Sequence, residues 1–338
     1  MTENNQIAVL GGGSFGTAIA NMVAGNGHTT RLWMRDAANA RQCADTRENS
    51  RYLPGYHLDE RLSITSDLAA ALDGANLVFF SVPSAAFRAL ARQVAPLVGP
   101  GTIAISTAKG IESSSFKLMS EILAEEMNAP RIGVISGPNI AQEVAANEIT
   151  ATVIASADPG VCEIVQRLLV TPFFRVYSNS DVYGVELAGA LKNIYGIEAG
   201  MASAMGVGQN TMSVLITRSL AEMTRFAARL GANPMTFLGL SGVGDLFVTC
   251  TSPLSRNFRV GQALGKGRSL EQAIVDVGQV AEGVNTARIV KQKADEMDVY
   301  MPLVTALCDV MFNKKSIPRV LYNMMQSEKT DDVEFRVG

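Results

Sequence analysis

The sequence predicts an α/β fold in which an N-terminal doubly wound domain is followed by an all-α C-terminal domain. In the first half of the chain, short apolar runs alternate with amphipathic helical patterns. This alternation is typical of a mainly parallel sheet covered by helices on both faces. Beyond about residue 180 only helical patterns with Gly or Pro between them follow. A chain of 338 residues is long enough for two domains, which we expect to span residues 1–180 and 181–338.

The expected elements follow from these patterns. Strands are predicted at Gln6–Leu10, Thr30–Met34, Asn76–Ser81, Thr102–Thr107, Arg131–Ser136, Ala151–Ala155 and Phe174–Tyr177. Helices of the first domain are predicted at Thr17–Ala24, Ala85–Val94, Phe116–Met127 and Gly160–Leu169. Helices of the second are predicted at Asp181–Met205, Asn210–Leu230, Arg256–Leu264, Asn285–Met297 and Leu303–Phe312. No Ser- or Gly-rich linker separates the domains, so the chain is expected to pass directly from the last strand into a helix.

Composition limits the possible partners. With 29 basic and 32 acidic side chains the net charge is −3, and the chain lacks the basic surface that nucleic acid binding requires. Only 18% of the residues are charged, so we expect part of the surface to be buried in a homodimer. Apolar stretches such as Leu77–Val82 are too short to span a bilayer, and the polar segment Met1–Gln6 does not resemble a secretory leader. We therefore expect a cytoplasmic protein.

Histidine and cysteine usage restricts the chemistry. The two histidines are His28, in an expected turn, and His57, in an expected loop after Pro54-Gly55. The cysteines are scattered without a CxxC pair, at Cys43, Cys162, Cys250 and Cys308. No metal site is expected from this set, and scattered reduced cysteines suit the cytosol. The acid–base group of an enzyme with this composition is therefore expected to be a lysine or a carboxylate.

A glycine-rich loop follows the first strand. Gly11, Gly13 and Gly16 form a GxGxxG pattern between an apolar strand and a helical run. This spacing permits a sharp turn, close approach of the backbone to a pyrophosphate, and tight packing of the helix on the strand. The free N–H groups of the helix N-terminus suit the phosphates. A merely tight turn is the alternative, but the context favours a Rossmann-type dinucleotide site.

The end of the second strand carries two residues that favour different nucleotides. An acid near this position normally holds the ribose 2′-hydroxyl of NAD, whereas an arginine accommodates the 2′-phosphate of NADP. This chain has Arg35 and Asp36 side by side. Arg35 could stack on adenine and reach a 2′-phosphate, while Asp36 could equally cap the next helix. We expect NADP(H) to be preferred and NAD(H) to be tolerated.

A lysine lies in an otherwise apolar helical segment of the second domain. Lys192 and Asn193 are flanked by Leu191 and Ile194, which is a costly environment for an ammonium group. One explanation is a snorkelling lysine at the edge of a helix. The other is a general acid–base catalyst, and the near absence of histidine favours it.

A second polar cluster lies further along the same domain. Asp245 follows a glycine-rich turn and could orient Lys192. Ser255 is predicted to cap a helix whose first turn contains Arg256 and Asn257. Because an arginine opposes the helix dipole there, its presence indicates a bound phosphate or carboxylate. A capped surface helix with a solvated arginine is the alternative.

Two further segments follow strands of the first domain. Lys109 comes directly after one strand, and Gly137 and Asn139 come after another. Ligands of open α/β sheets bind beyond the carboxyl ends of the strands. We therefore expect a ligand contact at Lys109, with an ordinary surface lysine as the alternative.

Together these motifs resemble the bacterial NAD(P)-dependent glycerol-3-phosphate dehydrogenases. The similar stretches run through nearly the whole chain: Gly11–Gly16, Thr107–Gly110, Ile135–Ala145, Gly189–Asn193, Leu215–Met223, Gly242–Asn257 and Gly278–Gly283. The resemblance implies reversible reduction of dihydroxyacetone phosphate to sn-glycerol 3-phosphate, feeding glycerophospholipid synthesis. Gly12, Asn139 and Tyr195 depart from the family pattern, which more often has alanine, Ser or Thr, and an aliphatic residue at these places.

The resemblance also implies roles for individual residues. Lys192 is expected to be the proton acceptor in the oxidation direction, with Arg256 and Asn257 anchoring the phosphate. Dinucleotide contacts are expected from Ser14, Phe15, Arg35, Lys109, Ala141, Arg256, Val280 and Glu282. Substrate contacts are expected from Lys109, Gly137, Asn139, Lys192, Asp245, Ser255, Arg256 and Asn257.

Two other functions fit parts of the pattern. A β-hydroxyacid dehydrogenase also joins a Rossmann domain to a helical one and uses a helix lysine, and its carboxylate substrate also needs an anion pocket. The block from Gly242 to Asn257 favours the phosphate ester. A dinucleotide sensor without catalysis would not need a buried lysine.

Overall fold

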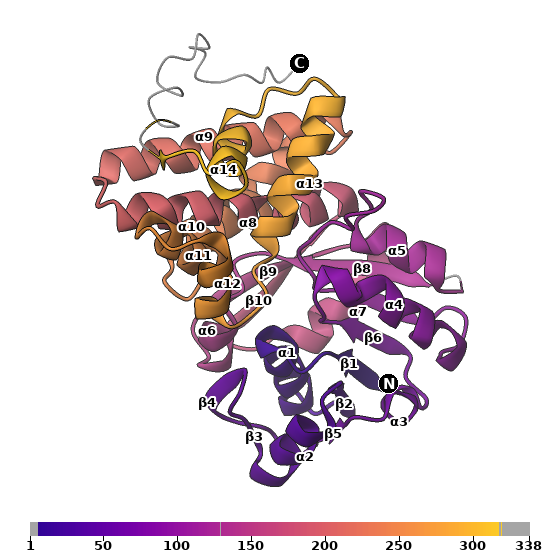
Figure 1. The fold of residues 1–338 in the computed structure, drawn as a ribbon. Helices are drawn as coiled ribbons and strands as arrows, with labels where there is room; N and C mark the ends of the chain where they lie inside the picture. Colours follow the sequence, from indigo (N-terminus) through magenta and orange to yellow (C-terminus); the bar gives the residue numbers. More distant parts are fainter. Residues whose placement is uncertain (1–5, 129, 318, 320–338) are drawn as a thin grey trace. The chain divides into compact units, whose positions relative to one another are not determined.

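The computed structural model describes residues 6–128, 130–317 and 319 (Figure 1). The chain divides into two compact units, one ending at Glu186 and the other beginning at Leu187, so the division lies within helix α8 (Val182–Ala204). The sequence analysis did not expect the segment Met1–Gln6 to be a secretory leader. Of this segment, only Gln6 lies within the described part. Among the described helices, none has both the length and the apolar character needed to cross a membrane.

The described part of the first unit is built on an eight-stranded sheet. Every neighbouring pair is parallel except β8 and β9, which are antiparallel. A separate antiparallel hairpin pairs β3 (Glu48–Asn49) with β4 (Leu53–His57). In spatial order the sheet consists of β10 (Phe174–Asn179), β9 (Thr150–Ala155), β8 (Arg131–Ser136), β7 (Ile103–Ser106), β6 (Leu77–Phe80), β1 (Ile7–Leu10), β2 (Thr30–Trp33) and β5 (Leu62–Thr65).

Helices cover both faces of this sheet because its strands are apolar on both sides. Ile7 and Val9 of β1 belong to one buried cluster, and Ala8 and Leu10 belong to the other. The first cluster includes residues of α1 (Ser14–Gly25), α2 (Ala37–Thr46), α6 (Ala141–Ala145) and α7 (Pro159–Leu169). The second includes residues of α3 (Leu68–Leu72), α4 (Ser84–Val94) and α5 (Met119–Glu126). Continuous burial on both faces is the expected signature of a doubly wound sheet.

The second unit is helical in its described part. The portion of α8 that lies in it is buried on almost all sides, which suits a central helix. Gly200 of α8 lies so close to α11 that a Cβ there would meet the Phe258 carbonyl oxygen at 2.0 Å. A 3₁₀ turn (Pro234–Leu238) and a π turn (Leu240–Gly244) separate α9 from α10. The remaining helices are α9 (Gln209–Arg229), α10 (Asp245–Thr251), α11 (Arg256–Gly265), α12 (Leu270–Val277), α13 (Glu282–Glu296) and α14 (Pro302–Met311).

The predicted fold class is confirmed, and each predicted strand and helix is present, with ends that match or shift by at most three residues. The expected loop at His57 is wrong. His57 ends β4 and pairs with Glu48, because Leu53 is buried and anchors the hairpin. The helix predicted from Phe116 begins only at Met119, because Phe116 has a left-handed φ of 61°. The hairpin, β5, α2, α3, α6, α10 and α12 were not among the predicted ranges.

Candidate active site

The glycine loop connects β1 to α1 with very close backbone packing. Gly11 has a φ of 122°, which favours glycine. A Cβ at Gly16 would lie 2.0 Å from the Gly11 carbonyl oxygen, so the helix can approach the loop only without a side chain there. Gly12 lies against Met34, because a Cβ at Gly12 would meet the Met34 Cγ at 2.4 Å. Glycine at position 12, one of the departures from the resembled pattern, therefore makes room for Met34.

The N-terminus of α1 fits a pyrophosphate. Gly13 precedes the helix without a side-chain cap, and a Cβ there would meet no atom within 4 Å. The first N–H groups of α1 are thus beside open space, where the helix dipole favours an anion. The Ser14 hydroxyl donates to the Tyr52 carbonyl oxygen at 2.6 Å, and Phe15 packs half-buried on the core. The residues present fit a dinucleotide.

Asn49, in the β3–β4 hairpin, supports this loop from outside the motif. Its Nδ2 donates to the Gly12 carbonyl oxygen at 2.9 Å and to the Thr17 Oγ1 at 2.8 Å. Asn49 is fully buried. The amide therefore fixes the loop to the first turn of α1. Sequence reasoning missed this residue, since nothing in the local pattern connects it to the glycines.

The acid after β2 is committed to structural contacts. Asp36 Oδ1 accepts from the backbone N–H groups of Ala38 and Asn39, at 3.0 and 3.1 Å, and so caps α2. Its Oδ2 lies 3.1 Å from the Arg51 guanidinium. The backbone bond from Asn39 lowers the pKa of Asp36, and Arg51 adds to this effect. Neighbouring Arg35 is exposed. Of the two roles considered for Asp36, the structure therefore shows the helix cap.

Lys109 and Gly137 lie at the carboxyl ends of the neighbouring strands β7 and β8. The Lys109 Nζ donates to the Gly137 carbonyl oxygen at 2.8 Å. Asn139 donates from Nδ2 to the Thr152 Oγ1 at 2.8 Å, and its Oδ1 is buried without a partner among the described residues. Ala141 begins α6. The sheet unit thus brings together the strand-end residues that the sequence indicated.

Lys192 lies inside the helical unit with two polar partners. It is 8% exposed, and its Nζ lies 2.9 Å from Asp245 Oδ1. The same Nζ donates to the Thr249 Oγ1 at 2.6 Å. Asp245 is 1% exposed and begins α10. The expected pairing of Lys192 with Asp245 is therefore present, and it excludes a lysine that reaches out to bulk water.

Thr249 was missed by sequence reasoning. It follows Asp245 by four residues, so in a helix both side chains lie on one face. The spacing of four residues from Asp245 would have indicated Thr249 only if helix α10 had been predicted. Close packing brings the face to Lys192, because a Cβ at Gly196 would meet the Thr249 Cγ2 at 2.7 Å.

Asn257 takes part in a chain of buried amides. Its Nδ2 donates to the Asn193 Oδ1 at 2.8 Å, and its Oδ1 accepts from the Gly283 N–H at 3.0 Å. The chain therefore links α8, α11 and α13. One N–H of Asn257 is left for other contacts after these two bonds.

Arg256 begins α11, which Ser255 caps as expected. The Ser255 hydroxyl oxygen accepts from the Phe258 N–H at 3.3 Å. The Arg256 side chain has access to solvent but is closely surrounded by protein atoms, and this partial desolvation lowers its pKa, an effect that the Glu282 carboxylate opposes. The group remains a cation. Glu282 begins α13, and Val280 is 51% exposed in the segment before it.

Tyr195, which departs from the resembling pattern, has a buried polar partner. Its hydroxyl lies 3.3 Å from Glu222 Oε1. Glu222 also accepts from the backbone N–H groups of Leu303 and Val304 at the start of α14, both at 2.9 Å. Burial raises the pKa of Glu222 to about 7. This tyrosine therefore has a structural explanation in the contacts between α8, α9 and α14.

The comparisons with known proteins agree with this geometry. Sequence models described as the N-terminus and the C-terminus of NAD-dependent glycerol-3-phosphate dehydrogenase match residues 6–162 and 181–322. The chain is 57% identical to a glycerol-3-phosphate dehydrogenase, NAD(P)+, of Teredinibacter turnerae, over 100% of this chain and 99% of that protein. It is 55% identical to the protein so named from Saccharophagus degradans, over 100% of this chain and 94% of that protein.

A solved structure agrees as well. The crystal structure of glycerol-3-phosphate dehydrogenase from Coxiella burnetii is similar with a TM-score of 0.92 and 35% identity. The similarity covers 96% of this chain and 100% of that one.

Proposed function

The chain belongs to the NAD-dependent glycerol-3-phosphate dehydrogenase family, and from this premise we propose the roles of its residues in the reaction. It is an oxidoreductase with glycerol-3-phosphate dehydrogenase activity that uses NAD(P)(H). Dihydroxyacetone phosphate is reduced to sn-glycerol 3-phosphate, and the reaction is reversible. The reduced nicotinamide supplies the hydride when it is bound.

Lys192 is the general acid–base catalyst. In the reduction it donates a proton to the substrate oxygen, and in the oxidation it accepts one. Its positive charge stabilises the negative charge that develops on that oxygen. The support is the buried position of Lys192 with Asp245 and Thr249, which hold the ammonium in one place. This is the single observation that carries the proposal.

Arg256 and Asn257 anchor the substrate phosphate. A guanidinium binds a phosphate through two parallel hydrogen bonds, and Asn257 has an N–H to contribute. The exposed position of Arg256 in the first turn of a capped helix supports this role. Binding energy at the phosphate then helps to position the carbonyl group. Other proposed substrate contacts are Lys109, Gly137, Asn139, Asp245 and Ser255.

The sheet unit holds the pyrophosphate of the dinucleotide. The glycine loop and the uncapped start of α1 support a pyrophosphate site. We assign residues 1–180 to dinucleotide binding and 181–338 to substrate binding and catalysis. Proposed dinucleotide contacts are Gly11, Gly13, Ser14, Phe15, Gly16, Arg35, Lys109, Ala141, Arg256, Val280 and Glu282.

The setting of the reaction is also part of the proposal. The product serves glycerophospholipid synthesis, and the enzyme acts in the cytoplasm as a homodimer. The low charged fraction of 18% supports burial of surface between subunits. Gel filtration with light scattering tests the subunit count.

The reaction is tested with purified protein and reduced nucleotide. Addition of dihydroxyacetone phosphate should lower the near-ultraviolet absorbance of NADPH and yield glycerol 3-phosphate. Oxidation of NADPH only with 3-oxo acids would instead indicate a β-hydroxyacid dehydrogenase. Binding of NADPH without turnover of either substrate class would indicate a dinucleotide sensor.

A further inference from the structure

Lys109 lies on an irregular segment between β7 and α5 that is fixed at its start. The Thr107 N–H donates to the Phe80 carbonyl oxygen at 3.0 Å, which continues the pairing of β6 with β7. The Thr107 hydroxyl also lies 2.8 Å from the Ser81 hydroxyl. Gly110 and Ile111, which follow Lys109, are buried. The segment therefore leaves the sheet in a defined direction. We call its residues from Thr107 to Glu112 the Lys109 path.

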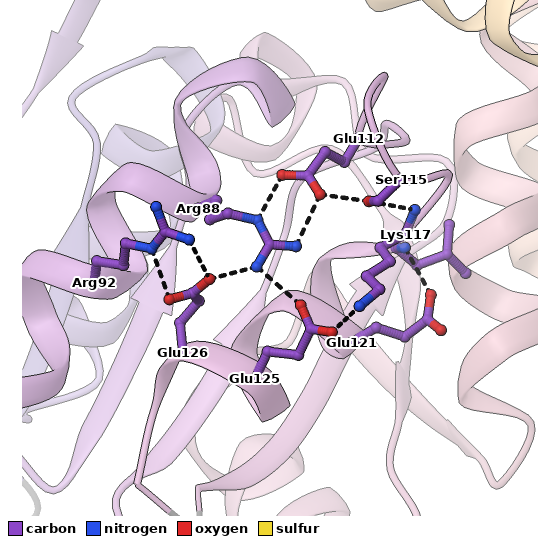
Figure 2. Close-up of polar contacts among 9 residues, drawn as sticks. Arg88, Arg92, Glu112, Ser115, Lys117, Glu121, Glu125 and Glu126 are labelled. Atoms are coloured by element: carbon purple, nitrogen blue, oxygen red, sulfur yellow. Dashed lines mark hydrogen bonds and ion pairs between the residues drawn. The ribbon is translucent and has the colours of Figure 1, made fainter.

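The far end of this path is held by an arginine of α4. Arg88 donates from Nε and Nη2 to the two carboxylate oxygens of Glu112, at 2.7 and 2.8 Å (Figure 2). The two side chains are only 20% and 17% exposed. The Arg88 bond lowers the pKa of Glu112 to about 2, and a bond from Ser115 adds to this. Glu112 is therefore ionised at every physiological pH, and a two-pronged pair of this kind fixes direction as well as distance.

The remaining contacts of the two arginines join α4 to α5. Glu125 also pairs with Lys117, which lies beyond Glu112 on the segment before α5. Arg88 also donates to Glu125, at 2.8 Å, and to Glu126. Arg92 donates to both carboxylate oxygens of Glu126, at 2.8 and 3.0 Å. Figure 2 shows Arg88 between Glu112 on one side and Glu125 and Glu126 of α5 on the other. Glu112 alone among these acids lies on the segment that carries Lys109.

We propose that Arg88 is a positioning residue for the reaction, acting through Glu112 to set the placement of Lys109. The inference rests on the proposed role of Lys109 in binding. Glu112 is three positions after Lys109, a reach of about 10 Å at most in an extended chain. With the start fixed at Thr107 and the end fixed at Glu112, the lysine has little freedom to move. Loss of the Glu112–Arg88 pair would release Lys109, and misplacement of a binding group by about 1 Å can lower the reaction rate by about 10²-fold.

The chain offers a matched pair of variants. Glu112→Gln and Glu125→Gln remove the same charge from the same arginine, but only the first lies on the Lys109 path. We expect Glu112→Gln to lower kcat/KM for dihydroxyacetone phosphate by about 10-fold or more, mainly through KM. Glu125→Gln should keep kcat/KM within about 2-fold of wild type, because Glu125 lies on α5 and not between Thr107 and Glu112. Its Tm should change about as much as that of Glu112→Gln, because both variants lose an ion pair with Arg88. Arg88→Lys, which keeps the charge but lacks the fork, should reproduce the KM effect.

A double-mutant cycle separates positioning from general stability. In a Lys109→Ala background Glu112→Gln should have almost no further effect on kcat/KM, because its influence passes through Lys109. Additive losses, or equal effects of Glu112→Gln and Glu125→Gln, would overturn the inference. A Lys109→Ala enzyme with wild-type kcat/KM would overturn the proposed role of Lys109, and this inference with it. Reduction of dihydroxyacetone phosphate by the wild type would stand in that case.

Discussion

The Lys192 ammonium and the Asp245 carboxylate form a buried ion pair, with Nζ and Oδ1 2.9 Å apart. Both side chains are almost fully removed from solvent. Such a pair does little for stability by itself, because desolvation offsets the attraction between the charges. Retaining it in an apolar helix is physically reasonable when the ammonium has a chemical role.

Replacing Asp245 tests how strongly the pair holds the lysine. Asp245→Asn leaves a buried ammonium without its counterion, which typically costs about 3–5 kcal/mol. We expect the free energy of unfolding to fall by this amount in urea titrations, and kcat to fall with it. Thr249→Val removes the other partner of Lys192 and should cost about 1–3 kcal/mol. An Asp245→Asn protein as stable as wild type would show that the pair does not restrain Lys192.

The phosphate-anchoring role of Arg256 predicts a change in substrate preference. Arg256→Lys keeps the charge but loses the two-pronged contact with phosphate. KM for dihydroxyacetone phosphate should rise far more than KM for unphosphorylated dihydroxyacetone, and kcat for the phosphate ester should fall. The measurement is kcat/KM for both substrates in both proteins. An unchanged preference would place the phosphate elsewhere, with Lys109 and Asn257 as the next candidates.

Cofactor preference should depend on Arg35. Asp36 caps α2 and pairs with Arg51, whereas Arg35 is exposed. Arg35→Ala should weaken NADPH binding by about 1–3 kcal/mol and leave NADH nearly unchanged. Fluorescence titration with both nucleotides measures this. Equal losses would mean that Arg35 stacks on adenine. Arg61→Ala, which removes an arginine paired with Asp59, is the matched control.

Glu186 predicts a pH dependence of stability. It accepts from the Ser120 N–H at 3.0 Å, and burial raises its pKa from 4.5 to about 7. The folded state then binds a proton at Glu186 that the unfolded state releases, so the contribution of this group to stability falls as pH rises from about 4.5 to about 7, by about 3 kcal/mol for this group alone. Glu186→Gln should make this slope shallower, with Glu222 still contributing its share, and should stabilise the protein at pH 8.

Denaturant titrations at several pH values check this. Glu163→Gln, in which the replaced acid is exposed on α7, should keep the wild-type slope. Parallel slopes for wild type and Glu186→Gln would contradict the assignment.

The sequence allowed the sheet unit and the main site residues to be predicted because their signals are local. The glycines at 11, 13 and 16 lie between a strand and a helix, and Ser255 directly precedes the helix that it caps. The unpredicted contacts come from residues far apart in the chain. Asn49 supports the glycine loop from a two-residue strand, too short for a periodic pattern. Thr249 reaches Lys192 from a short helix that begins after a π turn.

The central claim is that Lys192 transfers the proton in the reduction of dihydroxyacetone phosphate. The most direct measurement compares kcat for NADPH oxidation with this substrate in wild type and Lys192→Ala, together with NADPH affinity. We predict that kcat falls by about 10²–10⁴-fold, the usual contribution of general acid–base catalysis, while the dissociation constant for NADPH stays the same. A Lys192→Ala enzyme that retains about a third of wild-type kcat would contradict it, because that loss is far below the range for such a group.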